Sequence, residues 1–576
     1  MCGISGIIGE IKNKDEFILL SKDFLKRRGP DNFSFNLDIK RSSLICHSRL
    51  SLIDINSRSN QPFISKCGNY LISYNGELYN YKDIRNELME YGFKFKTTSD
   101  TEVFLYGLIH FGVEKFLSEK VEGMFAFAMH DLNKNILWMA RDIYGQKPLS
   151  YFIDQSKFLF ASDSRILSNY LNKKEIELES INGFLCYGYI PSNSGFYKNI
   201  FDLFPGHIYK YDVNTKNLYN FSLNKKADNS SNKQYNSYKD FKEKLILSVK
   251  EVFEADVDVG ILLSSGLDSS LIALISKYIL NKDPICYSLG SGLKKDEDED
   301  VRKFCKENSL KSFLFNIKPE QITEEYIKYP EIYDRPMSDT SCALISFLSK
   351  KVSKYTRCVL SGDGADELFW GYPRYKKYFL LDNLNHLTFS KDFINKFVIG
   401  KKLWKLFYKN PVEGYFRISN ASNGKLIFNN SYTNWTRIVD GDLYEYLPQN
   451  CLVKSDRASM FSSIEIRSPF LSKEMSICSK NIDFKTKYNI SKNKLFHRKF
   501  YQEITGKEYK INSKRGFSAN TNSIKEVLSK DYISGVEKSV QFLTASGYDH
   551  SLINQLIKNK QIKWRLFSLG LYLNSI

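Results

Sequence analysis

The chain has 576 residues, of which 42% are hydrophobic and 26% are charged. This balance excludes an intrinsically disordered protein, and the length exceeds that of one ordinary domain, so two or more packed cores are expected. The formal net charge of +18 comes from 83 Lys and Arg against 65 Asp and Glu. The basic residues are scattered rather than gathered in a long block, so we expect no nucleic-acid partner on charge alone.

The ten cysteines include no CxxC pair, which argues against a zinc site or a redox dithiol and favours reduced thiols. The first nine residues lack the cationic start and long apolar core of a signal peptide. No apolar run reaches the length that crosses a bilayer. These features predict a cytoplasmic protein without a membrane partner.

Short strand-like runs dominate the first ~200 residues, as alternation and aromatic content indicate. Strands are predicted at Leu71–Tyr74, Met124–Met129, Ile136–Ala140 and Lys157–Ala161, and helices at Tyr81–Tyr91 and Thr101–Phe111. The Asn75-Gly76 pair is a turn signal between strands. This pattern predicts an α+β domain over residues 2–209, with sheets that pack on each other.

A polar segment, residues 210–237, separates this half from the next. Residues 224–236 contain little that could enter a core, so the segment is predicted to be a linker. Beyond it, buried-strand runs occur at Val257–Leu263, Ile285–Leu289 and Cys358–Leu360. Helical spacing follows the first run, which predicts an α/β domain with a parallel sheet over residues 238–576, mostly helical beyond Asp382.

Cys2 is the strongest single candidate for a catalytic residue. Removal of Met1 would give Cys2 a free α-amino group beside its thiol. Both groups titrate near neutral pH, so the amine can serve as the base that activates the thiol. The thiolate is the nucleophilic form.

Five motifs follow one another in the first half: Cys2–Gly6, Arg28–Asp31, Arg49–Asp54, Asn75–Asn80 and Ser99–Glu102. Together they resemble the glutaminase domain of class II glutamine amidotransferases, which are N-terminal-nucleophile hydrolases. The resemblance implies stacked antiparallel sheets between helices and a catalytic Cys2. It places the Asn75 side chain and the Gly76 N–H as donors to the oxyanion of acyl transfer.

The glutamine-binding residues implied by the resemblance are Arg49, Asn75, Gly76, Glu77 and Asp100. Arg49 can hold the substrate α-carboxylate with a bidentate fork, and Glu77 and Asp100 can hold its ammonium group. Arg28–Asp31 receives no catalytic role, because it could simply brace a loop. The family usually has His where this chain has Arg27.

A phosphate-binding loop is predicted at Ser264–Ser270, between the Val257–Leu263 strand and a helix. Small residues allow close backbone approach, and the helix N-terminus offers free N–H groups. The absence of a GKS/T ending excludes a Walker-type loop. The stretch resembles the Ser-Gly-Gly-x-Asp-Ser loop of N-type ATP pyrophosphatases, with Ser265 replacing the first Gly, at a cost if that position needs a positive φ.

A second constellation, Ser361–Tyr372, also follows a buried strand. In a parallel sheet both loops would lie at the carboxyl edge, where ligands bind. Asp268 and Asp366 could then share a Mg²⁺ that touches the phosphates. The alternative is that each aspartate caps a helix.

Two further stretches, Asp456–Met460 continuing to Leu471 and Lys514–Phe517, complete a set that resembles the synthetase domain of asparagine synthetases. The resemblance implies ATP as cofactor, catalytic roles for Asp363 and Lys514, and a homodimer. Lys514 would neutralise charge while the carboxylate is adenylated. The implied ATP-binding residues are Leu262, Ser264, Ser265, Gly266, Asp268, Ser269, Leu289, Ser361 and Gly362.

The implied reaction converts aspartate to asparagine through β-aspartyl-AMP, with ammonia from glutamine. Four positions depart from the family: Asp363 replaces Glu, Trp370 replaces Gly, Ser472 replaces Asp, and Arg335 stands where an acidic or neutral residue is usual. The same chemistry on another carboxylate, such as a uronic acid of a surface polysaccharide, is therefore the alternative. A tRNA-modifying enzyme and an inactive scaffold are further alternatives.

Overall fold

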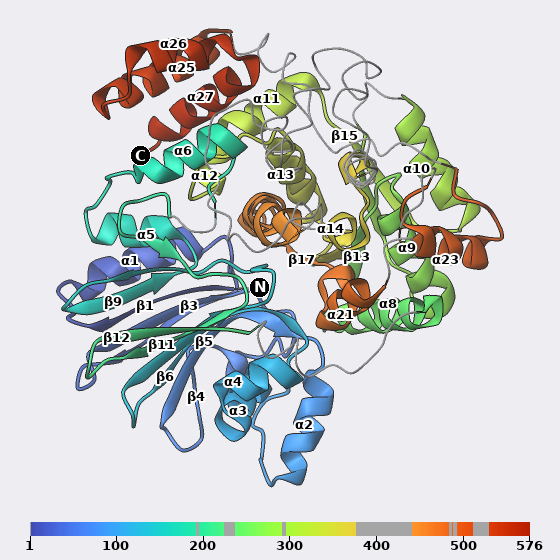
Figure 1. Cartoon of the computed structure of the whole chain (residues 1–576). Helices are drawn as coiled ribbons and strands as arrows, with labels where there is room; N and C mark the ends of the chain where they lie inside the picture. Colours follow the sequence, from blue (N-terminus) through green and yellow to red (C-terminus); the bar gives the residue numbers. More distant parts are fainter. Residues whose placement is uncertain are drawn as a thin grey trace, which may run out of the picture.

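The computed structural model describes residues 2–191, 195–223, 237–290, 295–375, 440–482, 487, 492–510 and 529–576. The chain forms two halves that lie against each other (Figure 1). The first is rich in β-strands, and the second is mainly helical and surrounds a parallel sheet. The two halves correspond to the α+β and α/β parts predicted from the sequence.

Within the described part of the first half, two antiparallel sheets have six strands each, in the orders β10-β8-β9-β1-β3-β2 and β12-β11-β7-β6-β5-β4. The strands of the first sheet are β1 Gly3–Gly9, β2 Asn32–Asp38, β3 Ser43–Arg49, β8 Ser150–Ile153, β9 Lys157–Ala161 and β10 Phe201–Asp202. Those of the second are β4 Phe63–Ile64, β5 Tyr70–Leu78, β6 Gly123–Asp131, β7 Ile136–Arg141, β11 His207–Asp212 and β12 Asn217–Ser222.

Alternation along β1 shows how the layers pack. Ile4 and Ile8 contribute to the core between the two sheets, together with Ala126 and Ala128 of β6. Ile7 points the other way, into the core that the first sheet shares with its helices, because successive strand residues face opposite sides. The helices of this half are α1 Lys14–Leu25, α2 Tyr81–Glu90, α3 Asp100–Phe111, α4 Val113–Lys115, α5 Ser164–Tyr170 and α6 Leu178–Tyr187.

Helices cover both outer faces, with α1 and α5 on the first sheet and α2 and α3 on the second (Figure 1). The predicted class, stacked antiparallel sheets between helices, is confirmed. The predicted turn at Asn75-Gly76 is wrong, because both residues lie inside β5, paired with β6. Likewise, β11 and β12 extend to Ser222, so the first part of the segment 210–237 belongs to the second sheet, while residues 224–236 lie outside the described residues.

The second half contains a parallel sheet of five described strands in the order β15-β14-β13-β16-β17. They are β13 Val259–Leu262, β14 Cys286–Gly290, β15 Ser312–Asn316, β16 Cys358–Leu360 and β17 Glu465–Arg467. The surrounding helices are α8 Tyr238–Val252, α9 Leu267–Leu274, α10 Lys295–Glu307, α11 Pro319–Ile327, α12 Tyr329–Ile332, α13 Ser341–Val352, α14 Ala365–Phe369, α20 Val453–Phe461, α21 Lys473–Asn481 and α23 Leu495–Thr505. The predicted parallel sheet is therefore confirmed.

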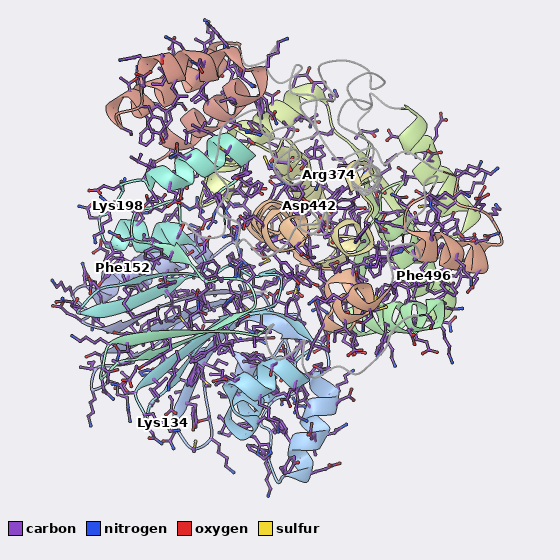
Figure 2. The ribbon with its side chains drawn as sticks, in the orientation of Figure 1. Lys134, Phe152, Lys198, Arg374, Asp442 and Phe496 are labelled. Carbon is purple, nitrogen blue, oxygen red and sulfur yellow. The ribbon has the colours of Figure 1, made fainter. Side chains whose placement is uncertain are left out.

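Three C-terminal helices, α25 Ser529–Ala545, α26 His550–Lys558 and α27 Lys560–Leu573, lie beside α6 of the first half (Figure 1). Arg565 ties them to α6 by donating to the carbonyls of Leu185 and Cys186. Described residues on either side of 376–439 are also joined, since Arg374 pairs with Asp442 at 2.8 Å (Figure 2). No helix in the described ranges combines the length and apolar character needed to cross a membrane.

Candidate active site

Cys2 lies where the two sheets of the first half meet. It directly precedes β1 of one sheet, and its backbone N–H donates to Asn75 Oδ1 of the other at 3.0 Å. The residue is only 6% exposed. Burial raises the pKa of the Cys2 thiol, while the Leu50 backbone N–H and the Arg49 guanidinium act in the opposite direction. A base next to the thiol is therefore needed to form the thiolate near neutral pH.

The Asn75 side chain is held in one orientation and keeps one group unused. Its oxygen accepts the Cys2 N–H, while its Nδ2 is buried without a hydrogen-bond partner among the described residues. Leaving such a donor unpaired costs ~1–3 kcal/mol, and each case in a native fold calls for an explanation. Gly76 follows where a Cβ would come 2.3 Å from the Met124 carbonyl oxygen, so only glycine fits β5 there.

Arg49 is placed at the end of β3, beside Cys2, with most of its donors already engaged. Its Nη1 donates to Asn56 O at 2.8 Å and Asn60 Oδ1 at 2.9 Å, and its Nη2 donates to Asp54 O at 2.5 Å. The predicted fork to a substrate carboxylate would have to share these nitrogens or use Nε. What Arg49 does here is order the loop that follows β3.

Glu77 and Asp100, the predicted ammonium ligands, are both buried, and Asp100 Oδ2 accepts the Leu78 N–H at 3.0 Å. Glu77 Oε2 lies 3.0 Å from Arg467 Nη2, which comes from β17 of the other half. Burial raises the pKa of Glu77, and Arg467 opposes that rise. Arg467 belongs to the stretch that resembles the synthetase domain, but no local spacing connects it to Glu77, so its contact at this site was not predicted.

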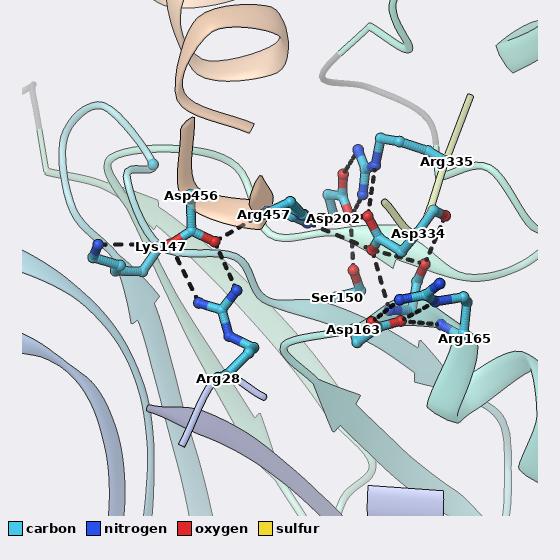
Figure 3. A network of polar contacts seen from close by, with 12 residues as sticks. Arg28, Lys147, Ser150, Asp163, Arg165, Asp202, Asp334, Arg335, Asp456 and Arg457 are labelled. Carbon is cyan, nitrogen blue, oxygen red and sulfur yellow. Dashed lines mark hydrogen bonds and ion pairs between the residues drawn. The ribbon is translucent and has the colours of Figure 1, made fainter. Parts of the chain in front are cut away.

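The Arg28–Asp31 motif joins Cys2 to the second half. Arg28 Nε donates to the Cys2 carbonyl at 3.1 Å, and its Nη1 and Nη2 donate to the two carboxylate oxygens of Asp456 at 2.8 and 3.2 Å. Lys147 lies 3.6 Å from the same carboxylate (Figure 3). The motif therefore braces Cys2 against the second half.

The predicted phosphate loop lies between β13 and α9. Ser264 N donates to Ser269 Oγ at 3.1 Å, and Gly266 N donates to Ser264 Oγ at 3.1 Å. The loop is therefore held by hydrogen bonds from its backbone to its own serine hydroxyls. Ser265 does not have a positive φ. The serine that replaces a family glycine is accommodated without left-handed backbone strain, and its carbonyl accepts the Tyr509 hydroxyl at 2.6 Å.

The other predicted nucleotide contacts gather at the carboxyl edge of the parallel sheet. Leu262 is the last residue of β13 and Leu289 the next-to-last of the neighbouring β14, and both are partly exposed, which is compatible with the predicted adenine contact. Ser361 and Gly362 follow β16, the next strand on the other side of β13. A Cβ on Gly362 would approach the Cβ of Asp268 to 3.1 Å, so glycine lets the two loops meet.

Asp268 and Asp366 both form ion pairs with the side chain of Lys494. Lys494 Nζ donates to Asp268 Oδ2 and to Asp366 Oδ1, each at 2.6 Å, and the lysine side chain is 4% exposed. Two carboxylates that already share a cation are oxygen donors of the kind that Mg²⁺ takes. The pair therefore fits the predicted metal role, and Lys494 is a residue that none of the sequence motifs includes.

Asp363 borders a small cavity between the two halves. Its Oδ2 accepts from Ser361 Oγ at 3.0 Å and from Ser455 Oγ at 3.2 Å. The cavity is lined by Gln146, Lys147, Ser361, Asp363, Leu452, Ser455, Asp456, Ile466 and Ser468. Because Asp456 also holds Arg28, the cavity is close to Cys2 as well as to the nucleotide loops. Lys514, predicted to be catalytic, lies outside the described residues.

Three of the departures from the family pattern have a structural reading. Arg335 points into the first half, where its Nη1 and Nη2 donate to Asp202 at 2.6 and 3.1 Å (Figure 3). Ser472 caps α21 by accepting the Met475 N–H at 3.2 Å, a role that Ser and Asp fill equally well. Trp370 adopts a left-handed φ of 61° directly after α14, where glycine would be relaxed.

Comparison with known proteins agrees with both halves. Residues 1–222 match the model of the glutamine amidotransferase domain, and residues 240–566 match that of asparagine synthase. The chain is 26% identical to asparagine synthetase (glutamine-hydrolyzing) 1 of Bacillus subtilis strain 168, covering 90% of this chain and 87% of that protein. It is 28% identical to a putative asparagine synthetase 2 of Methanocaldococcus jannaschii, covering 80% and 98%. It also resembles Amidase chry2 of Gibberella zeae, at 26% identity, with 77% and 72% covered.

The fold, the site and these matches define a glutamine-dependent amidotransferase in which an N-terminal-nucleophile domain precedes a synthetase domain. The chain belongs to the asparagine synthase family, whose members use ATP and hydrolyse glutamine.

Proposed function

We propose that Cys2, exposed as the N-terminal residue once Met1 is removed, releases ammonia from glutamine, and that the second half uses ATP and this ammonia to convert aspartate to asparagine. The observation that carries the first reaction is the buried, unpaired Asn75 Nδ2 beside Cys2. When the thiolate attacks the glutamine side-chain amide, charge develops on the amide oxygen. A donor fixed in advance for that charge is what lowers such a barrier.

Proton transfer completes the first reaction. The α-amine of Cys2 takes the thiol proton and passes it to the leaving ammonia, and water then hydrolyses the thioester. In the second reaction the aspartate β-carboxylate attacks the α-phosphate of ATP, pyrophosphate leaves, and ammonia displaces AMP. Magnesium held by Asp268 and Asp366 would offset phosphate charge, and Lys514 would neutralise the α-phosphate as the carboxylate attacks.

The cavity beside Asp363 supports transfer of ammonia between the two sites. It is bordered by Gln146 and Lys147 from the first half and by Asp363 and Asp456 from the second. A protected route keeps ammonia from becoming ammonium and keeps water off the acyl-adenylate. We propose that the cavity forms part of that route.

The choice of aspartate as acceptor has two supports. The relatives covering most of the chain include proteins named asparagine synthetase. Of the four departures, Arg335 and Ser472 make structural contacts with residues that do not line the Asp363 cavity, which favours structural roles for them over roles in acceptor choice. Asp363 and Trp370 remain as differences near the loops, and they are why a uronic acid stays the alternative acceptor.

Two measurements test this function. Cys2→Ala is expected to abolish glutamine hydrolysis while leaving amide synthesis from added ammonium, whereas Cys67→Ala, at an exposed cysteine, should keep both. Amide formation with glutamine and ATP should then be compared for aspartate and for nucleotide-linked uronic acids. Turnover of uronic acids without turnover of aspartate would overturn the acceptor assignment, and retention of Met1 in mature protein would overturn the role of Cys2.

A further inference from the structure

The amine of Lys494 occupies the space between the two aspartates expected to hold Mg²⁺. It contacts one oxygen of each carboxylate at 2.6 Å and is almost fully buried. No motif that predicted the nucleotide site includes this lysine, and the proposed mechanism gives it no role.

The surrounding backbone is shaped around this contact. Lys494 has a left-handed φ of 52° just before α23, and Asn493 Nδ2 donates to the Gly371 carbonyl at 2.7 Å. A Cβ on Gly371 would come 1.8 Å from Asp366 Oδ1 and 2.4 Å from Lys494 Cε. Glycine at this position leaves room for the lysine to reach Asp366, so the contact is built into the fold.

The same oxygens cannot serve the lysine and a metal ion together. Mg²⁺ binds carboxylate oxygens at ~2.1 Å, and an ammonium held by the same two oxygens would lie in direct repulsive contact with it. Without a cation, the buried carboxylate of Asp366 and the mostly buried carboxylate of Asp268, whose side chain is 14% exposed, would repel each other strongly at this separation. Lys494 therefore supplies the positive charge that this pair requires before any ligand binds.

We propose that Lys494 is a resident counter-ion that keeps free divalent metal ions out of the nucleotide site until the metal arrives on a polyphosphate. The inference rests on the proposed role of Asp268 and Asp366. Metal bound to a nucleotide brings negative phosphate oxygens with it, and these offer the displaced ammonium a new partner. A free metal ion brings no phosphate oxygens, so its binding would leave the Lys494 ammonium without a new partner and next to a divalent positive charge.

The test uses Mn²⁺ binding to the whole chain, followed by electron paramagnetic resonance, without glutamine or acceptor. Wild type should bind Mn²⁺ weakly on its own and tightly with α,β-methylene-ATP. Lys494→Met should bind free Mn²⁺ about 10- to 100-fold more tightly than wild type, the factor that a lost charge-assisted hydrogen bond corresponds to. The matched control is Lys492→Met, because Lys492 pairs with Glu508 at a more exposed position nearby.

Thermal unfolding supplies a second readout in case Lys494→Met folds poorly. Mn²⁺ alone should raise the unfolding midpoint of Lys494→Met and of Lys494→Gln but not that of wild type. Equal binding of free Mn²⁺ by wild type and by Lys494→Met would overturn the inference. Failure of wild type and variants to bind Mn²⁺ even with the nucleotide analogue would instead overturn the metal role of the two aspartates, and this inference with it.

Discussion

The Asp202–Arg335 pair gives the sharpest test of how the two halves are joined. Both side chains are buried, and the guanidinium contacts both carboxylate oxygens, at 2.6 and 3.1 Å. Burial opposes ionisation, but the Arg335 charge keeps the pKa of Asp202 below its ordinary value. Asp202→Asn removes the negative charge of the side chain while keeping its shape. The buried guanidinium of Arg335 then has no carboxylate at this position.

Removing one member of a buried ion pair costs ~3–5 kcal/mol. The lower end applies here, because Arg335 Nε keeps Asp334 Oδ1 at 3.3 Å. A domain of this size loses ~2 °C of unfolding midpoint per kcal/mol, so Asp202→Asn should lower the midpoint of the first half by roughly 6 °C. Differential scanning calorimetry measures the shift, and the amide formed per glutamine hydrolysed should fall with it if the halves separate.

Glu175→Gln is the matched control, because Glu175 pairs on the surface with Lys198, which is labelled in Figure 2. Exposed pairs contribute little to stability because solvent screens them, so this variant should melt like wild type. Asp202→Asn with Arg335→Met removes both charges and should recover part of the loss. The reasoning is refuted if Asp202→Asn melts with the control, or if the double variant is less stable than Asp202→Asn alone.

Three further predictions concern single side chains. Arg467→Met should lower kcat/KM for glutamine hydrolysis at least ~10-fold, since Glu77 loses its cation, whereas an unchanged rate in a folded variant would exclude that role. Burial raises the pKa of Glu122 to about 8, above its value in the unfolded chain, so the free energy of unfolding should fall as pH rises from ~4 through 8. Glu122→Gln should make this fall smaller when unfolding midpoints are compared at pH 6 and pH 9. The same pH dependence in Glu122→Gln as in wild type would contradict the prediction. Trp370→Gly should destabilise the protein by ~2 kcal/mol in urea unfolding, because burial of the indole ring contributes more free energy than the left-handed backbone of Trp370 costs. A variant more stable than wild type would show that the backbone strain is the larger of the two.

Local patterns predicted much of this molecule. The strands at Met124–Met129 and Lys157–Ala161 appear as expected, and two of the glutaminase motifs contact Cys2 through Arg28 and Asn75. The prediction of a turn at Asn75-Gly76 was wrong because turn propensity contains no information about strand β6, which pairs with both residues. The prediction of the turn was local, whereas the pairing that overrides it is tertiary.

Long-range partners could not be predicted from spacing. Arg335 drew attention as a change near the acceptor, yet its partner Asp202 lies 133 positions away in the other half. Lys494 lies 226 positions from Asp268, and nothing in its own sequence neighbourhood marks it as the cation of that pair. A lysine or arginine acquires such a role only when the fold brings a buried carboxylate to it.

Arg467 shows why the two reactions share one framework. Its guanidinium reaches Glu77 of the proposed glutamine site, while its backbone carbonyl accepts the N–H of Ser361 of the proposed nucleotide site at 2.9 Å. A strand residue cannot shift one of these contacts without disturbing the other, because β17 is held in register against β16. The Arg28–Asp456 pair fixes a second point between Cys2 and the cavity. With two buried, charge-assisted attachments, the distance from Cys2 to the loops that follow β13 and β16 is set by the fold, which is the condition that the proposed transfer of ammonia requires.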